Sequence, residues 1–400
     1  MIAILLAPFY ILVNLYVVNW MFQWMGTCNF LFRTLAFRAV FSGFYIFLAT
    51  AVLTGFLIKK PSQLHRSLKN TGNYFLGMFL YILMVIAFVD CGRIILKNFF
   101  HVSWIRSGAA FVISGLLCAV LIIIISIYGI LHVRTFKTTS YEITVRKAVE
   151  DMDSLKIVLI ADTHFGYSVG HKHAEMLANA INAEKPDLIC IAGDIFDNEF
   201  DAVEYPEKLK DNLSSLQAEY GVYACWGNHD LNEPILAGFT FKNPKQDKND
   251  PRMELFLKDC GIRLLNDEST LIDNKFYLVG RKDLSRTEKI DTEIEKRRLT
   301  PAQLTSELDH TKPIFFLDHQ PKELQEIAEA GADLDLCGHT HNGQMFPGNL
   351  LLHLFWENPC GYLRKGSMHN IVTSGAGIWG PNMRVGTDNE ICVITVKFNN

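Results

Sequence analysis

The segment LKIVLIADTH, residues 155–164, decides the fold of the larger part of this chain. Its apolar run at residues 157–161 is short and continuous, which is typical of a strand buried on both faces of a sheet. Asp162 and His164 follow at the carboxyl end of this strand, where open α/β sheets bind their ligands. A carboxylate oxygen and an imidazole nitrogen at a strand end together favour a metal site.

Short apolar segments alternate with helical segments after this first strand. The alternation is the βαβ pattern of a layered α/β domain. We expect strands at residues 187–192, 222–225, 276–279, 313–317, 334–337 and 391–398, and helices at 172–182 and 322–330. Residues 239–252 are rich in Lys, Asn and Asp, and they predict a polar insertion that is either a mobile flap or a passive surface loop.

Five polar clusters occur near the expected strand ends. They are DTH at 162–164, GDIFD at 193–197, GNHD at 227–230, DHQP at 318–321 and GHTH at 338–341. Four directly follow a short apolar strand, so their side chains should meet at one rim of the sheet. Two cations about 3.5 to 4 Å apart need a bridging carboxylate and mixed oxygen and imidazole ligands. Asp194 is the natural bridge, because Gly193 lets the backbone turn tightly before it.

Single residues of these clusters also have plain structural interpretations. His319 is typical of a loop histidine and Asp194 of a turn, but five motifs in this order favour a metal centre. Asp197 fits a partner of a metal ligand and a helix cap equally well. His171 and His173 are expected at the solvated start of a helix rather than in another metal pair.

The ordered motifs resemble those of the calcineurin-like metallophosphoesterase superfamily over residues 155–398. The segment GHTHNGQ at 338–344 and the tail with SGAG at 374–377, Arg384 and NEI at 389–391 are similar to a membrane-associated bacterial phosphodiesterase branch. That branch more often has Gly and Pro where Asn342 and Asn389 stand. The resemblance implies an α/β domain at residues 155–400, a four-layer αββα sandwich. Arg384 either binds the phosphate of a substrate or pairs with Glu390.

The resemblance also implies a set of ligands for two divalent metal ions, which would be manganese, iron or zinc. The first ion would bind Asp162, His164 and His341, the second Asn228, His319 and His339, and Asp194 would bridge them.

His229 would face the phosphate, stabilise the transition state and protonate the leaving oxygen, with Asp230 as its orienting partner. The implied reaction is hydrolysis of a phosphomonoester or phosphodiester through attack by a metal-activated hydroxide. Neither a cysteine nor a serine nucleophile is required.

The first third of the chain has a different composition. No charged side chain occurs in residues 1–25, 39–58, 72–89 or 108–133, and each run is near the ~20 residues that cross a bilayer as a helix. We expect a transmembrane region of four helices at residues 1–133 and a polar linker at 134–154 with a strand at 141–145. A signal peptide is disfavoured, because no basic residue precedes the first run and no small-residue cleavage site follows it.

Charge and cysteine content bear on location and partners. The first 133 residues carry nine basic side chains and one acidic one, a net charge of +8; because the whole chain carries −4, the remainder carries −12. An acidic domain disfavours a nucleic-acid partner, and with it a nuclease of the same superfamily. Basic residues number six on the side of the catalytic domain and five on the other, which favours a cytoplasmic domain. Cysteines inside the expected strands favour a reducing compartment in the same way.

We therefore predict a multi-pass protein of the cell membrane that hydrolyses a phosphate ester. The short linker holds the domain close to the bilayer, so a lipid-linked phosphate is the preferred substrate. The alternative is a membrane transporter or sensor with a regulatory phosphoesterase domain. Asn14, Asn19 and Ser114 within the expected spans fit helix packing better than a transport path.

Overall fold

The computed structural model describes residues 2–58, 62–231, 235–236, 239–240, 250–284 and 298–399, and the chain divides into two units. The first, which we call the helical unit, consists of Met1–Leu131, Ile235–Thr240 and Gly380–Met383. The second, the sheet unit, consists of His132–Pro234, Phe241–Trp379 and Arg384–Asn400.

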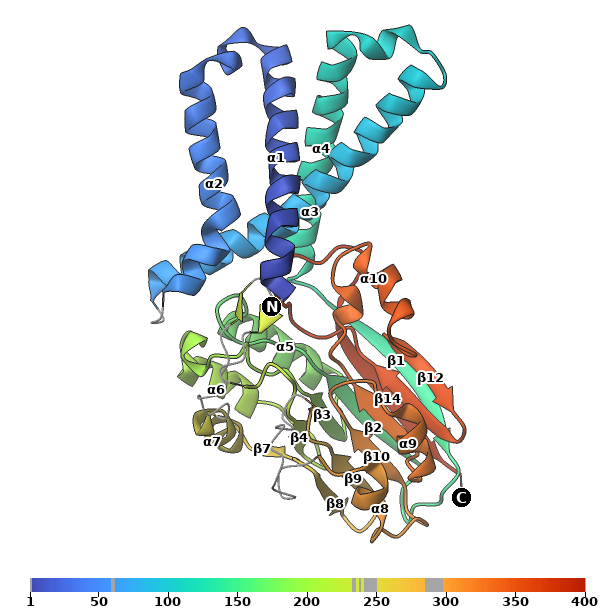
Figure 1. Cartoon of the computed structure of the whole chain (residues 1–400). Coiled ribbons are helices and arrows are strands. Elements are labelled where there is room, and N and C mark those ends of the chain that lie inside the picture. The colour runs from blue at the N-terminus through green and yellow to red at the C-terminus, as the bar shows by residue number, and fades with distance from the viewer. Residues whose placement is uncertain are drawn as a thin grey trace. The chain divides into compact units, whose positions relative to one another are not determined.

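The helical unit is formed by four long helices (Figure 1), which are α1 Ile2–Cys28, α2 Leu35–Leu57, α3 Gln63–Asn98 and α4 Gly108–His132. Among the described residues, α2, α3 and α4 are long and apolar enough to cross a membrane. The helix α1, which contains the first uncharged run, is not one of these three, and it carries Asn14, Asn19 and Gln23 among its apolar residues. The fourth predicted crossing stays a prediction.

The helix α3 extends beyond the uncharged run that predicted it. It has 36 residues and includes Asp90 and Arg93. Asp90 accepts hydrogen bonds from the Tyr16 hydroxyl at 2.8 Å and the Trp20 indole at 3.0 Å, and it lies 3.5 Å from Arg93. This carboxylate on an apolar helix is therefore held by polar partners, as helix packing in a membrane requires.

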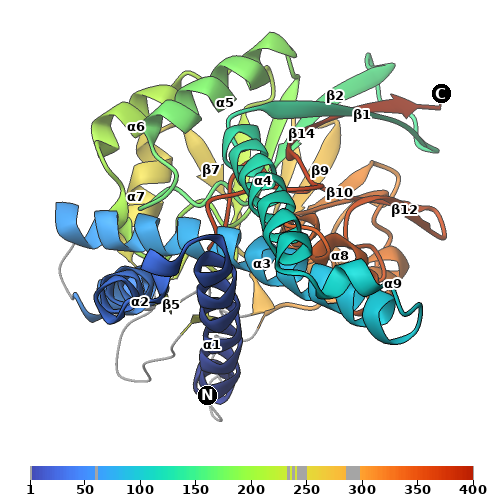
Figure 2. The ribbon, with the colours of Figure 1, turned by 90° about the horizontal axis from the view of Figure 1, so that it is seen from above.

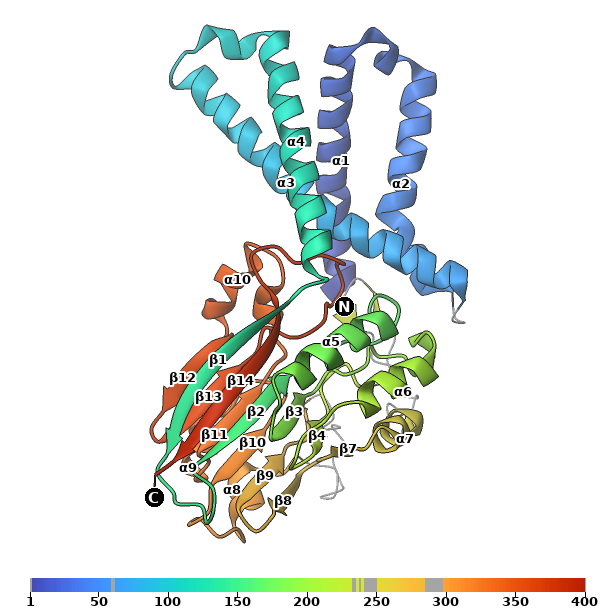
Figure 3. The same cartoon turned by 180° about the vertical axis from the view of Figure 1, so that it is seen from behind.

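The sheet unit contains two mixed sheets of six strands each (Figure 3). The first has the order β1 Phe136–Val145, β14 Asn389–Phe398, β2 Ser154–Ile160, β3 Leu188–Ala192, β4 Val222–Cys225 and β7 Ile262–Leu264. The second has the order β12 Gly361–Lys365, β13 Met368–Val372, β11 Leu334–Cys337, β10 Ile314–Leu317, β9 Phe276–Gly280 and β8 Glu268–Ile272. The antiparallel pairs are β14 with β2, β12 with β13, and β8 with β9.

Helices cover the outer faces of both sheets, so the unit has four layers in the order αββα (Figure 2). The first sheet is covered by α5 His171–Ala183, α6 Pro206–Ser214 and α7 Pro251–Asp259. The second is covered by α8 Pro301–Thr305 and α9 Leu324–Glu329. The predicted sandwich is confirmed.

The strand β2 shows why the sequence lacks a polar alternation here. Leu155, Ile157 and Leu159 point into the buried cluster between the sheets, whereas Val158 and Ile160 face the cluster beneath the helices. Both faces of the strand are buried, so both faces are apolar. The cysteines predicted to lie in strands are buried and unpaired, namely Cys190, Cys225, Cys337 and Cys392.

The segment predicted as a linker contributes a whole strand to the first sheet. β1 begins at Phe136 rather than at residue 141, and it pairs in parallel with β14 along ten residues. Ile143 and Val145 of this strand are buried in the cluster between the sheets. The sheet therefore begins well before residue 155.

The predicted polar insertion at 239–252 has ordered ends. Phe239–Thr240 forms β6, which pairs with β5 at Ile235–Leu236, and Asp250 caps α7 through the backbone N–H of Arg252. Residues 241–249 lie outside the described residues, so the choice between a flap and a passive loop stays open.

We predict that a fragment of residues 150–400 melts at a lower temperature than a fragment of residues 132–400. Deleting β1 removes Ile143 and Val145, each worth about 1.5–3 kcal/mol of burial, and exposes the edge of β14. The melting temperature of a domain of this size falls by about 2–4 °C per kcal/mol of lost stability, so we expect it to fall by about 10 °C. Thermal melting followed by circular dichroism measures it, and equal midpoints would show that β1 does not stabilise the sheet.

Candidate metal centre

Loops after four strands bring two groups of candidate ligands together, and Asn228, after a fifth strand, contacts the second group. Among the described residues, the first group is Asp162, His164 and His341, and the second is Asp194, His319 and His339. The candidate ligand atoms within each group lie within 4.8 Å of one another. The loops follow β2, β3 and β4 of the first sheet and β10 and β11 of the second. The predicted residues do converge, but at a rim that both sheets build.

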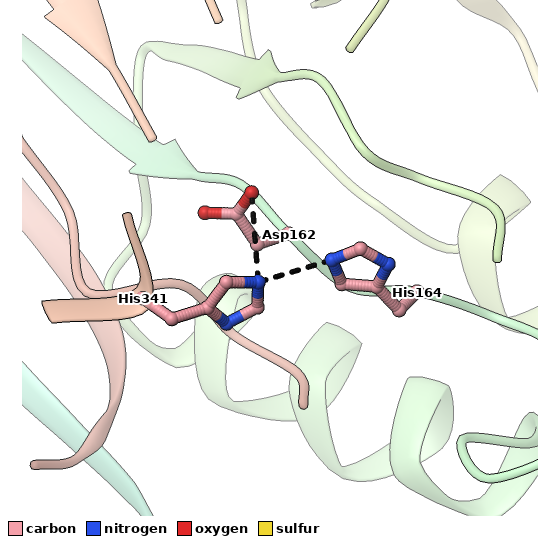
Figure 4. A group of neighbouring side chains, drawn as sticks. All are labelled: Asp162, His164 and His341. Atoms are coloured by element: carbon pink, nitrogen blue, oxygen red, sulfur yellow. Dashed lines mark hydrogen bonds and ion pairs between the residues drawn. The ribbon is translucent and has the colours of Figure 1, made fainter. Parts of the chain in front are cut away.

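In the first group, two imidazoles face each other (Figure 4). His164 Nε2 lies 3.0 Å from His341 Nε2, which lies 4.0 Å from Asp162 Oδ1. Burial lowers the pKa of His164 to about 3, so the ring is neutral and offers a lone pair. Burial also raises the pKa of Asp162 to about 8, which shows how poorly this pocket tolerates an uncompensated negative charge. A cation between these atoms would supply the compensation.

The second group converges on His319 Nε2. This atom lies 3.2 Å from Asp194 Oδ2, 3.2 Å from His339 Nδ1 and 3.0 Å from Asn228 Oδ1, while Nδ1 donates to the Ala192 carbonyl at 2.8 Å. Burial opposes a charge on this ring, yet the Asp194 carboxylate raises the pKa of His319 well above its usual value. A proton on His319 or a metal ion at this point would balance the charge of the Asp194 carboxylate.

Asp194 reaches both groups. Its Oδ2 atom lies 3.2 Å from His319 Nε2 and 3.7 Å from His164 Nε2, and its Oδ1 atom accepts the backbone N–H of His229 at 2.7 Å. The donor set of carboxylate, amide and imidazole groups fits divalent manganese, iron or zinc. Two Asp/His groups that share one carboxylate between them are consistent with a binuclear metal site.

Glycines allow the loops to approach so closely. A Cβ atom on Gly227 would lie 2.1 Å from Asp194 Oδ1, and one on Gly193, whose φ is +78°, would lie 2.7 Å from the backbone nitrogen of Gly227. Left-handed backbone with φ between 47° and 75° also occurs at five of the predicted ligands, which are Asp162, His164, Asp194, His339 and His341. Such strain, roughly 1–3 kcal/mol per residue, is concentrated at functional sites in proteins.

His229 lies beside the first group, with its ring centroid 5.3 Å from that of His164. Its Nδ1 atom is 2.6 Å from Asn198 Oδ1. Because an amide oxygen only accepts, Nδ1 carries the hydrogen, and Nε2 is the nitrogen able to exchange a proton with a ligand. Asn198 was not among the predicted site residues, although it directly follows the GDIFD motif.

Asp230, predicted to orient His229, has a different visible role. Its two oxygens accept the backbone N–H groups of Phe196 and Gly227, each at 2.8 Å. It therefore ties the GDIFD loop to the GNHD loop. Its catalytic role stays a prediction.

The structure bears on two of the alternatives that the sequence left open, those for Asp197 and His173. Asp197 Oδ1 lies 3.8 Å from His164 Nδ1, which favours a partner of a metal ligand over a helix cap. His173 lies in the first turn of α5, at the start of a helix as predicted. It is buried, however, and its Nε2 lies 2.6 Å from the Ala376 carbonyl, so the prediction of a solvated position is wrong for it. Its ring packs against Phe136, a contact that no sequence pattern indicates.

Arg384 lies behind His341 rather than in contact with solvent. It is buried, it donates to the Ser374 and Gly377 carbonyls at 2.7 Å each, and it lies 3.4 Å from His341 Nδ1. Glu390 accepts instead from Thr139 and from the Ser374 backbone. These contacts replace both predicted alternatives, since they make Arg384 a support of the His341 loop.

Two mixed sheets between helices, with paired Asp/His groups at one rim, define the class of metallophosphoesterase-like domains. The model of the family described as calcineurin-like phosphoesterase matches residues 155–343. The match begins in β2 and ends just after His341, so it contains all the candidate ligands. Residues 155–343, just under half of this chain, are therefore similar to the calcineurin-like phosphoesterase family.

Curated relatives with the same domain include membrane proteins. An uncharacterized metallophosphoesterase of Campylobacter jejuni is 28% identical over 292 residues, which are 72% of this chain and 70% of that protein. A transmembrane protein with metallophosphoesterase domain from Danio rerio is 28% identical over 312 residues. The match covers 73% of this chain and 66% of the length of that protein. The UDP-2,3-diacylglucosamine pyrophosphatase of Chlamydia trachomatis is 23% identical over 232 residues, 50% of this chain and 67% of its own.

We predict that Gly227→Ala abolishes metal binding while Gly170→Ala does not. The new methyl group at residue 227 would collide with Asp194 Oδ1, whereas a Cβ at Gly170 meets nothing within 4 Å. Displacing the shared carboxylate should lower the metal content of the purified protein at least about tenfold, the low end for disturbing a ligand shell. Inductively coupled plasma mass spectrometry measures the metal. Equal metal content in both variants would contradict the role given to Asp194.

Proposed function

We propose that this chain is a membrane-anchored phosphoesterase that uses two divalent metal ions. The observation that carries the proposal is the position of Asp194 within 4 Å of His319 and His164, one from each group. Asp162, His164 and His341 would hold the first ion, Asn228, His319 and His339 the second, and Asp194 both. Bound there, the two ions would supply activated water and neutralise charge on the phosphate.

The remaining residues position the substrate and move a proton. His229 Nε2 is available to donate a proton to the leaving oxygen, because Asn198 holds the ring through Nδ1. Asp230 fixes the loops that carry Asp194 and Asn228 relative to each other. Arg384 supports the backbone and ring of His341 from behind, so that this ligand keeps one orientation.

The finer parts of the proposal concern the substrate and the membrane. A lipid-linked phosphate ester is favoured by the apolar helices of the same chain and by the name of the Chlamydia relative, which acts on a diacylated nucleotide sugar. We place four crossings in the membrane and the sheet unit on the cytoplasmic side, and we favour manganese. Both monoesters and diesters remain candidate substrates.

The transporter or sensor alternative has less support in the helical unit. The polar side chains described there contact each other, since the Tyr45 hydroxyl donates to Asn14 Oδ1 at 2.9 Å and Asn14 donates to the Tyr10 carbonyl at 2.7 Å. Such pairs are typical of helix packing. A nuclease is disfavoured by the −12 charge of residues 134–400.

We predict that Asp194→Asn and His229→Ala both remove activity, but in different ways. Asp194→Asn should lose metal together with turnover, because the amide cannot compensate two cations. His229→Ala should keep its metal and lose about 10²–10⁴ in kcat, the usual contribution of a general acid. Full-length protein with manganese is assayed against phosphomonoesters, nucleotide diesters and phospholipids. Asp259→Asn, a change at an exposed surface carboxylate, is the matched control, and full activity of Asp194→Asn would overturn the proposal.

We predict that Asn198 acts as a positioning residue for His229. Asn198→Ala should lower kcat about 10- to 100-fold, as loss of a partner behind a functional histidine does, with unchanged metal content. Asn198→Asp should recover most of the rate, because a carboxylate also accepts from Nδ1 and tolerates the left-handed backbone at this position, where φ is 62°. If both variants keep full kcat, Asn198 does not orient His229.

A further inference from the structure

A short apolar loop follows the GHTHNGQ motif, and the phosphoesterase chemistry leaves it unexplained. It spans residues 345–356 and contains α10 at Gly348–Leu351 and a 3₁₀ turn at Leu352–Leu354 (Figure 1). Five of its large apolar side chains are exposed, which are Phe346, Leu350, Leu351, Leu354 and Phe355. We call this segment the apolar loop.

Most large apolar side chains of the sheet unit are buried, and those of the apolar loop are an exception. Leu354 is 74% exposed and Phe355 79%. Of the eleven large apolar side chains that are exposed among the described residues of this unit, five lie between residues 346 and 355. Scattered exposed leucines are ordinary, but such a concentration marks a binding surface.

The base of the apolar loop is fixed to the fold. Met345 is buried, the Phe346 N–H donates to the Val385 carbonyl at 2.8 Å, and the Gly348 N–H donates to the Met345 carbonyl at 2.7 Å. A Cβ atom on Gly343 would lie 2.4 Å from the Asn349 nitrogen, so the backbone folds tightly onto the metal-ligand motif. The loop thus presents its apolar side chains from a defined position.

The far end of the loop touches the metal centre. The Trp356 ring lies 5.2 Å from the ring of His339, a candidate ligand, and Lys322 Nζ lies 4.9 Å from the Trp356 ring. The Thr340 hydroxyl, between the two histidines of the motif, donates to the Pro359 carbonyl just beyond the loop. The end of the apolar loop therefore lies beside His339, with Lys322 on the same tryptophan ring.

We propose that the apolar loop dips into the bilayer surface and receives the acyl chains of a lipid whose phosphate ester lies at the metal centre. The inference rests on the proposed function and narrows its substrate to a membrane lipid. We infer the occupant from the chain itself, because α2, α3 and α4 are long and apolar enough to cross a membrane. A tryptophan and a lysine at the border of exposed Leu and Phe side chains are the composition of interfacial segments.

Depth of insertion tests the loop without relying on catalysis. Full-length Phe355→Trp and Leu255→Trp proteins are reconstituted in phosphatidylcholine vesicles, and tryptophan quenching by brominated phosphatidylcholine is compared with that of the wild type. Leu255 is 59% exposed on α7 and serves as the matched control. We expect added quenching for Phe355→Trp alone. Equal quenching in the two variants overturns the inference, as does a Phe355→Trp signal that depends on protein concentration, which would indicate a second copy on the loop.

Turnover then separates this inference from the proposed function. The double variant Leu354→Ser/Phe355→Ser and the control Leu255→Ser are assayed with manganese on soluble bis(p-nitrophenyl) phosphate and on vesicles that contain a diacylated nucleoside-diphosphate lipid. We expect the double variant to keep its activity on the soluble substrate. Its kcat/KM on vesicles should fall at least about tenfold, because burial of one Leu or Phe side chain corresponds to about that ratio in affinity. Equal losses on both substrates, or none on vesicles, overturn the inference. If the wild type cleaves neither substrate, the proposed function fails, while the quenching result still decides where the loop lies.

Discussion

The Asp194 carboxylate is the point on which the rest of the site depends, because it lies within 4 Å of an imidazole from each of the two groups. One of these imidazoles belongs to the first sheet's own rim and the other to the loop after β10 of the second sheet. The carboxylate can meet both only when the two sheets are packed face to face. Assembly of the inter-sheet core and assembly of the metal centre are therefore one event.

That arrangement is costly for the chain without compensation. Several ligands are buried polar groups in left-handed backbone, and such a cluster is destabilising unless charge is balanced and every polar atom finds a partner. The balance is partly internal, through the Ala192 carbonyl at His319 and the His339 N–H at Asp162. These hydrogen bonds do not balance the negative charge of Asp162 and Asp194. Divalent cations would supply the missing positive charge.

The surfaces of the two units differ in polarity and suit different solvents. In the sheet unit, the large apolar side chains are mostly enclosed between and outside the sheets, and the surface carries the acidic excess. In the helical unit, apolar side chains on the outside of α2 and α4 are widely exposed, such as Leu35 at 84% and Leu117 at 65%, which water does not favour and lipid does. The apolar loop is the place where the sheet unit shares the surface chemistry of the helical unit.

The local sequence predicted a layered α/β domain and the convergence of five polar clusters at one rim, because an apolar run indicates a buried strand and a polar motif at its end indicates a ligand. The resemblance to a known family implied the αββα sandwich and the ligand set, which is Asp162, His164, Asp194, Asn228, His319, His339 and His341. The apolar helices of the first third were also predicted from local composition. The full length of α3 was not predicted, because Asp90 and Arg93 interrupt the uncharged run without ending the helix.

The side chains that contact and orient the site histidines could be identified from the tertiary structure alone. Asn198 holds His229 across 31 residues of sequence, Asp230 joins two loops, and Arg384 contacts His341 across 43 residues. The pairing of β1 with β14 joins residues 136–145 to 389–398 across most of the chain. Such partners are chosen by packing across long sequence separations, and no periodicity records them. The residue types at the strand ends define the chemistry of the site, and the packing of two sheets defines its geometry.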